Sequence, residues 1–204
     1  MPLFYQHTIN DKVQLAVWHI TEEENFFLAK VQLQKKINHP HKRLQHLAGR
    51  YLLQLIDAEF PVHAIEIAES NKPLLADASF HFSISHCGNY AAAIVSTANT
   101  VGIDIEMITH KVDSIKNKFL SAEEFRLLPS VSNTWLTVLW SCKEAIYKWY
   151  GFGGIDFKEH IIIKNISVND NQGIVSCGFT KNKDMHLNTN FRLFQNLCLA
   201  WVIV

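Results

Sequence analysis

The sequence lacks the features that define several classes of protein. Lysine plus arginine and aspartate plus glutamate both total 19, so no excess charge draws the chain toward nucleic acid or an anionic membrane. No apolar run approaches the roughly 18 residues of a membrane-spanning helix, and the N-terminus has no signal-peptide pattern. We therefore expect a soluble cytoplasmic protein that binds neither nucleic acid nor a membrane.

Cysteine and histidine lack the spacings that metal and disulfide sites require. The 4 cysteines are widely separated and form no CxxC pair. The 11 histidines include no HExxH or HxxxH motif, which would place two of them on one helical face. There is also no G-x-S-x-G motif of a serine hydrolase. These absences disfavour a zinc site, a disulfide scaffold and a serine hydrolase.

The order of helix and strand signals is similar in the two halves of the chain. Its 204 residues, 48% of them hydrophobic, can form one substantial core or two small ones. Apolar residues at helical spacing predict a helix that begins at Pro40 and another over 133–150, each followed by strand signals. We expect an α+β fold of two similar lobes, 1–98 and 99–204, that form one cooperative unit with the active site in the cleft between them.

Shorter patterns predict the remaining elements. Two S/T-x-x-E capping boxes occur, Thr21 with Glu24 for a helix that ends near Leu33, and Ser121 with Glu124 for a short helix. The strand signals cover, in chain order, residues 13–17, 64–69, 80–85, 90–96, 101–106, 157–168, 173–180, 191–194 and 197–204.

The segment Gly-Ile-Asp-Ile-Glu at 102–106 is the most informative one. In a strand, residues two apart point to the same side, so Asp104 and Glu106 project together. Two carboxylates this close are unfavourable unless one binds a proton or a cation lies between them, and hard oxygen ligands favour Mg²⁺ or Mn²⁺. For this segment alone, solvated acids at a sheet edge are the simpler interpretation.

The helix expected over 133–150 carries a second group of ionisable residues. Its apolar residues form one stripe, and Glu144 and Lys148 lie one turn apart on the opposite face. For this pair alone, the simplest interpretation is a surface ion pair worth about 0.3–0.5 kcal/mol.

A third group of candidate ligand-binding residues lies in the first half. The strand expected over 80–85 ends at Ser85 and His86, and Gly88 then lets the backbone turn. A hydroxyl, an imidazole and free amides at a strand end suit a phosphate. The helix that begins at Pro40 adds a basic face, for which solvation is the default and a phosphate clamp the alternative; its members are Lys42, Arg43, His46 and Arg50.

In their order and spacing, these segments resemble the phosphopantetheinyl transferase superfamily, in its two-lobed monomeric form. The motifs that carry the resemblance, within residues 40–155, are KP at 72–73, F-x-I-S-H-x-G at 82–88, GIDIE at 102–106, F-L-S-A-E-E-F at 119–125 and W-S-x-K-E-A-x-x-K at 140–148. The combination of GIDIE with the last motif is specific, and it favours a functional site over the simpler interpretations above. The family implies an α+β fold whose two lobes form a pseudo-dimer.

The resemblance also implies an activity. Members transfer the 4′-phosphopantetheine group from coenzyme A to a serine of an apo acyl or peptidyl carrier protein, with Mg²⁺, and release 3′,5′-ADP. By resemblance, Asp104, Glu106 and Glu144 would hold Mg²⁺, and Glu144 would also take the proton of the carrier serine. Lys143 and Lys148 would neutralise the coenzyme A phosphates.

Coenzyme A would also be bound by residues of the first half. By resemblance these are Arg43 and Arg50 near the 3′-phosphate, Lys72 and Pro73 beside the adenine, and Ser85 and His86 at the nucleotide phosphates. One departure is Gly151-Phe152-Gly153, where family members often carry a lysine between the glycines. Carrier recognition therefore need not follow that of the better-known members.

Two alternatives of other classes are open at this point. One is a catalytically inactive protein that binds coenzyme A or a carrier protein. The other is a magnesium-dependent phosphohydrolase that uses water in place of the carrier serine. The intact set of Asp104, Glu106, Glu144 and Lys148 argues against the inactive protein, and release of 3′,5′-ADP only in the presence of apo carrier protein would exclude the hydrolase.

Overall fold

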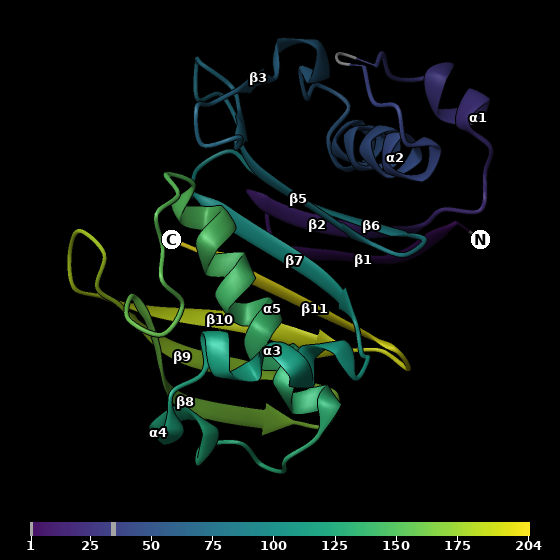
Figure 1. Ribbon diagram of the computed structural model, residues 1–204. Coiled ribbons are helices and arrows are strands. Elements are labelled where there is room, and N and C mark those ends of the chain that lie inside the picture. The colour runs from purple at the N-terminus through teal and green to yellow at the C-terminus, as the bar shows by residue number, and fades with distance from the viewer. Residues whose placement is uncertain (1, 34–35) are drawn as a thin grey trace. The chain divides into compact units, whose positions relative to one another are not determined.

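The computed structural model describes residues 2–33 and 36–204. The chain divides into two compact units, Met1–Val101 and Gly102–Val204. Each unit combines one main sheet with a long helix on one of its faces (Figure 1), which confirms the predicted α+β class. Within the described residues, no helix has both the length and the apolar character to cross a membrane.

The first unit contains a four-stranded sheet in the order β1-β2-β6-β5, with every neighbouring pair antiparallel. Helix α2 packs against β6, β2 and β5, and the short strands β3 and β4 form a separate pair. The elements are β1 Leu3–Asn10, β2 Val13–His19, α1 Glu24–Leu28, α2 Pro40–Ile56, the 3₁₀ turn η1 Val62–Ala64, β3 Glu66–Ile67, β4 Pro73–Leu74, β5 His81–Cys87 and β6 Tyr90–Ser96.

Helix α2 forms the core of the first unit together with the sheet. Pro40 occupies its first turn, as predicted, and the His39 side chain caps it by accepting a hydrogen bond from the Lys42 N–H. A Cβ atom on Gly49 would lie 2.6 Å from Ile84 Cγ2, so the helix lies too close to β5 for any larger residue there. The fully buried apolar residues of the helix are Leu47, Ala48, Leu52 and Leu53.

The second unit contains a five-stranded sheet in the order β7-β11-β10-β9-β8, and helix α5 packs along β11 and β10. The pairs β8–β9, β9–β10 and β10–β11 are antiparallel. The elements are β7 Val101–Met107, α3 Lys111–Phe119, α4 Ala122–Phe125, α5 Asn133–Tyr150, β8 Ile161–Asn169, β9 Gln172–Phe179, β10 Met185–Leu193 and β11 Leu197–Ile203.

The helix boundaries of the second unit follow from capping residues. Ser121 and Glu124 form the predicted capping box at the start of α4, in which each side chain bonds to the backbone N–H of the other residue. The Ser132 hydroxyl accepts from the Trp135 N–H at the start of α5. The same helix ends at Gly151, whose φ of 74° is left-handed and favours glycine. The predicted span of α5 is confirmed.

The capping box expected at Thr21 and Glu24 is wrong. The Glu22 carboxylate accepts from the Trp18 indole N–H and the Thr21 N–H, and these contacts hold the backbone extended. Helix α1 therefore starts only at Glu24, its N-cap Glu23 makes no side-chain cap, and it ends at Leu28 rather than near residue 33.

Strands β3 and β8 begin later than expected and β4 was not expected, and three further elements also differ from the expected pattern. Strand β1 was not expected, because its sequence LFYQHTIN mixes polar and apolar residues and its residues are only half-buried or exposed. Helix α3 was also missed, since only two of its nine residues are buried. Strand β10 begins at Met185 instead of residue 191, because its first half alternates polar and apolar residues next to β9.

Strand β7 and helix α5 approach each other most closely at Gly102. A Cβ atom at this position would lie 2.0 Å from the Ala145 carbonyl oxygen and 2.9 Å from Trp149 Cβ. No heavy atom can occupy that space. The absence of a side chain at Gly102 is therefore what lets the strand lie directly on the helix.

We predict that Gly102→Ala costs about 3 kcal/mol of unfolding free energy, at the upper end for an overpacked core. The added methyl group would push β7 away from the backbone of α5. The matched control is Gly178→Ala in β9, where the new Cβ would meet the flexible Lys164 side chain at 3.3 Å. Urea denaturation of the two variants measures the difference. Equal stabilities would show that strand and helix can accommodate a methyl group at position 102 at little cost in unfolding free energy.

Candidate active site

Strand β7 presents two carboxylates toward helix α5. The side chain of Asp104 is 2% exposed, and that of Glu106 is half-buried. Residues 102, 104 and 106 share one face of the strand, whereas Ile103 and Ile105 are fully buried on the other. The two acids were predicted to share one face of the strand. The structure agrees, because each of them bonds to a side chain of α5.

Helix α5 contributes three polar side chains on successive turns. The Lys148 ammonium donates to Asp104 Oδ1 at 2.6 Å, and the Trp140 indole donates to the Glu106 carboxylate. Glu144 lies between them along the helix and feels the charges of Asp104, Glu106 and Lys148. The simple interpretation of Glu144 and Lys148 as a surface ion pair is therefore wrong, because Lys148 bonds to a buried acid of a different element.

Burial and mutual repulsion raise the proton affinity of the two glutamates. Burial raises the pKa of Glu106 to about 7, with a further increase from the Asp104 charge, while the Trp140 hydrogen bond and Lys148 act in the opposite direction. Burial also raises the pKa of Glu144 to about 7, the Asp104 and Glu106 charges add to it, and Lys148 opposes it. The charges of the three carboxylates and of the Lys148 ammonium therefore affect one another.

These carboxylates suit a hard divalent cation. Carboxylate oxygens are the ligands that Mg²⁺ prefers. The pKa values of Glu106 and Glu144 are raised first by burial and then by neighbouring carboxylates, and a bound cation would favour the ionised form of both. In the part of the chain that the structure describes, no three acidic, histidine or cysteine side chains form a ready-made metal site. Beside Asp104, the cation in this structure is the ammonium of Lys148.

Lys143 does not belong to this cluster. Its side chain is 0% exposed, and its ammonium donates to the Glu124 carboxylate and to the carbonyl oxygens of Phe119 and Phe157. All three N–H groups are therefore used in the interior of the second unit. The expectation that Lys143 neutralises a coenzyme A phosphate is wrong for this structure.

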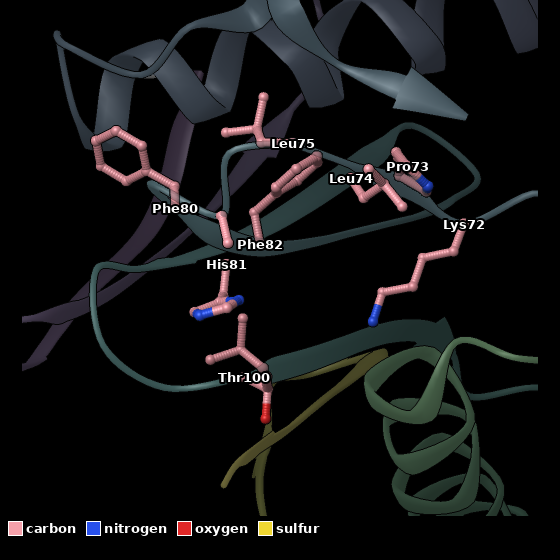
Figure 2. A pocket seen from close by; sticks show the side chains of 10 residues that line it. Lys72, Pro73, Leu74, Leu75, Phe80, His81, Phe82 and Thr100 are labelled. Carbon is pink, nitrogen blue, oxygen red and sulfur yellow. The ribbon is translucent and has the colours of Figure 1, made fainter. Parts of the chain in front are cut away.

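A small pocket in the first unit is lined by Lys72 and Pro73. Its volume is about 100 Å³, and the aromatic rings of Phe80 and Phe82 contribute apolar lining. In the view of Figure 2, the Lys72 ammonium and the His81 imidazole extend in the same direction. Burial lowers the pKa of the Lys72 ammonium. The pocket therefore offers a small apolar surface with a cation at its edge.

The two arginines of α2 have different surroundings. Arg43 forms a two-pronged ion pair with Glu24, with Nε–Oε1 at 2.7 Å and Nη2–Oε2 at 2.8 Å, and its third nitrogen donates to the Ile37 carbonyl. Arg43 could meet a phosphate only by leaving Glu24. Arg50 is buried beside His46, and burial lowers the pKa of its guanidinium to about 10. Arg50 is thus the better candidate for binding an anion.

Ser85 and His86 do not share a face of β5. They pair with Ala92 and Ala91 of β6 in a regular register, so their side chains point to opposite sides of the sheet. His86 is exposed, whereas Ser85 is 5% exposed. The structure does not bring the two side chains together on one surface.

Three contributors to these sites were not identified from the sequence. Trp140 holds Glu106, Glu124 anchors Lys143, and His81 lines the pocket beside Lys72. Trp140 stands in the W-S-x-K-E-A motif, so that motif could have indicated it. Phe152 is 81% exposed between two glycines with left-handed φ, where the sequence departs from the family pattern.

The acid cluster lies within the segment that matches a known family. Residues 100–201, half of the chain, match the model of the 4′-phosphopantetheinyl transferase superfamily. The chain belongs to this superfamily. The match contains β7 and α5 together with Asp104, Glu106, Glu144 and Lys148, so the cluster lies in the part of the chain that defines membership.

Two named relatives are similar in sequence to about half of the chain. Enterobactin synthase component D of Salmonella typhi is 34% identical over 113 residues, which are 52% of this chain and 47% of the relative. The 4′-phosphopantetheinyl transferase psf-1 of Bacillus pumilus is 38% identical over 117 residues, 52% of this chain and 50% of the relative. The match thus spans about half the length of each of these relatives.

We predict that the metal-free protein loses stability as the pH rises from about 4.5 to about 7, because Glu106 and Glu144 hold their protons more tightly when folded than when unfolded. Glu144→Gln removes one of these groups while keeping its shape. Between about pH 5 and about pH 8, the wild type should lose about 1–2 kcal/mol more than the variant, since partial exposure screens the charge.

Urea denaturation in the presence of a chelator measures this difference. Every other ionisable group is common to both proteins, so the difference between the two curves reports Glu144 and its coupling to Glu106. Parallel curves would mean that Glu144 ionises normally in the folded chain.

Proposed function

We propose that this chain transfers the 4′-phosphopantetheine group from coenzyme A to a serine of an apo acyl or peptidyl carrier protein, with Mg²⁺, and releases 3′,5′-ADP. The observation that carries the proposal is the meeting of Asp104, Glu106 and Glu144 in one field beside Lys148, inside the segment that matches the superfamily. The Bacillus pumilus relative is named a 4′-phosphopantetheinyl transferase.

Asp104, Glu106 and Glu144 are the residues that would hold Mg²⁺. When bound, the ion would offset the negative charge of the pyrophosphate and of the leaving nucleotide. The three carboxylates fit this role because they supply hard oxygen atoms and carry an excess of negative charge in the free protein. Trp140 orients one of them through its hydrogen bond to Glu106.

The transfer forms one bond and breaks another at the same phosphorus. The carrier serine oxygen bonds to the phosphorus on the pantetheine side of the pyrophosphate, and the bond from that phosphorus to the oxygen of 3′,5′-ADP breaks. The serine proton goes to the Glu144 carboxylate, which a bound cation would keep ionised and able to accept it. Lys148 supplies a positive charge within reach of the same cluster.

Donor binding is the proposed role of the first unit. Lys72 and Pro73 line a pocket of suitable character for the adenine, and buried Arg50 offers a cation for a phosphate. His86, exposed at the end of β5, is a further candidate phosphate contact. Arg43 is a weaker candidate because Glu24 holds it, and Ser85, which is as buried as Arg50, would need the same access to the phosphate.

We further propose that the protein acts as a cytoplasmic monomer whose macromolecular partner is the carrier protein. The formal net charge of +0 bears on the partner alone, because a neutral chain has no general attraction for nucleic acid or anionic membranes. Recognition of an acidic carrier then depends on local complementarity.

We expect Asp104→Asn to lower the transfer rate by more than about 100-fold, because even residues that only support a metal ligand typically contribute 10–100-fold. The measurement is the mass of candidate apo carrier proteins after incubation with enzyme, coenzyme A and Mg²⁺. The matched control is Asp170→Asn, the same change at an exposed turn with a left-handed φ of 54° that asparagine tolerates.

Three outcomes would contradict the proposed function. Transfer that continues in excess chelator would remove the metal from the reaction. An Asp104→Asn variant as active as Asp170→Asn would remove Asp104 from the site. Release of 3′,5′-ADP without carrier protein would indicate a phosphohydrolase.

Lys72→Met should raise the KM for coenzyme A by about 10-fold or more, since a hydrogen bond to a charged group is worth about 1.5–3 kcal/mol. The methionine keeps most of the volume and removes the charge. Initial rates at varied coenzyme A concentration provide the measurement, with exposed Lys12→Met as the control in the same unit. An unchanged KM would place the nucleotide away from this pocket.

A further inference from the structure

The ammonium of Lys143 is enclosed in the interior of the second unit. Its side chain is 0% exposed and lies 2.6 Å from Glu124 Oε1, with the carbonyl oxygens of Phe119 and Phe157 each at 2.7 Å. An ammonium has three donors, and here each has an acceptor. A buried ion pair of this kind stabilises only when its geometry is this complete, so the arrangement is closely specified.

Glu124 connects the same ammonium to two further elements. Its Oε1 also accepts from the Ile163 N–H of β8 at 2.8 Å, and its Oε2 accepts from the Ser121 N–H at the start of α4. Phe119 ends α3, and Phe157 lies in the loop before β8. The pair of Lys143 and Glu124 therefore fixes α5 to α3, to α4, and to the start of β8.

Helix α5 is held from a second direction at Gly102. There, β7 lies so close that a Cβ atom would overlap the Ala145 carbonyl. One residue along an α-helix corresponds to about 1.5 Å of rise and about 100° of rotation. Because α5 is held on two sides, it can neither slide nor turn without breaking the Lys143 contacts or the Gly102 contact. Glu144 directly follows Lys143, so the direction of its side chain depends on both the Lys143 contacts and the Gly102 contact.

We propose that Lys143 and Glu124 form a positioning pair, which fixes α5 so that the Glu144 carboxylate points toward Asp104 and Glu106. The inference deepens the proposed function, because it concerns the residue expected to hold the metal and to accept the serine proton. A functional site tolerates displacements of only about 0.5 Å, which a loosened helix would exceed. Lys143 thus acts through Glu144 and contacts no substrate.

The test is the double variant Lys143→Met with Glu124→Gln. Methionine matches the length of the lysine stem, and the double change leaves no buried charge alone. The single carboxamide oxygen of glutamine can accept from the Ile163 N–H or from the Ser121 N–H, but not from both. We expect this protein to fold cooperatively. Its kcat should fall by about 10-fold or more, with the KM for coenzyme A changed by less than about 2-fold, as for loss of a supporting residue.

A second readout does not depend on transfer. Tb³⁺ prefers oxygen ligands, and its emission should be sensitised by Trp140, whose indole bonds to Glu106. The double variant should bind Tb³⁺ about 10-fold more weakly than the wild type, by the same supporting-residue reasoning. The matched control is Lys116→Met with Asp113→Asn, which removes an exposed ion pair in the same unit and should change neither readout.

Crystal structures of the wild type and the double variant separate this inference from the proposed function. A shift of α5 against β7 in the double variant supports the positioning role, and an unshifted helix with unchanged Tb³⁺ affinity and kcat overturns it. A rise in the KM for coenzyme A at constant kcat would also overturn it, since Lys143 would then contact the donor. Wild-type protein that binds Tb³⁺ but transfers nothing to any apo carrier would instead reject the proposed function alone.

Discussion

The contact between the backbone of α5 and Gly102 is the constraint on which the site depends. Strand β7 can lie on the helix only because no side chain separates them, and the next two residues on that face are Asp104 and Glu106. They meet Lys148 and Trp140 because the strand follows the helix toward its N-terminal end. A larger residue at 102 would move both acids away from α5 at once.

This contact concentrates like charges in a half-buried place, which is unfavourable in the free protein. Burial raises the pKa of Glu106 and of Glu144 to about 7, and the neighbouring negative charges add to both shifts. The Lys148 ammonium offsets the negative charge of Asp104. The repulsion between the remaining carboxylates persists because the buried Lys143 holds α5 on its other side, so the helix cannot move away from the strand.

The sequence was most informative where the deciding interactions are local. Alternation along β7 predicted the shared face of Asp104 and Glu106, and the glycine at 151 predicted where α5 ends. The burial of Lys143 was not predictable in the same way, because its acceptors come from other elements and nothing beside it in the sequence indicates them. Likewise, Arg43 was interpreted as part of a basic surface because its partner, Glu24, belongs to a separate helix.

The groups proposed for donor binding and for metal binding differ in sign. In the first unit, Gly49 on the helix faces Ile84, an apolar residue, and the groups proposed for donor binding include two cations whose pKa values burial lowers, Arg50 and Lys72. In the second unit, the glycine is on the strand and acids follow it. An anionic donor together with Mg²⁺ would supply an anion to the first group and a cation to the second. The charges that cost stability in the free protein are therefore those that the proposed substrates would neutralise.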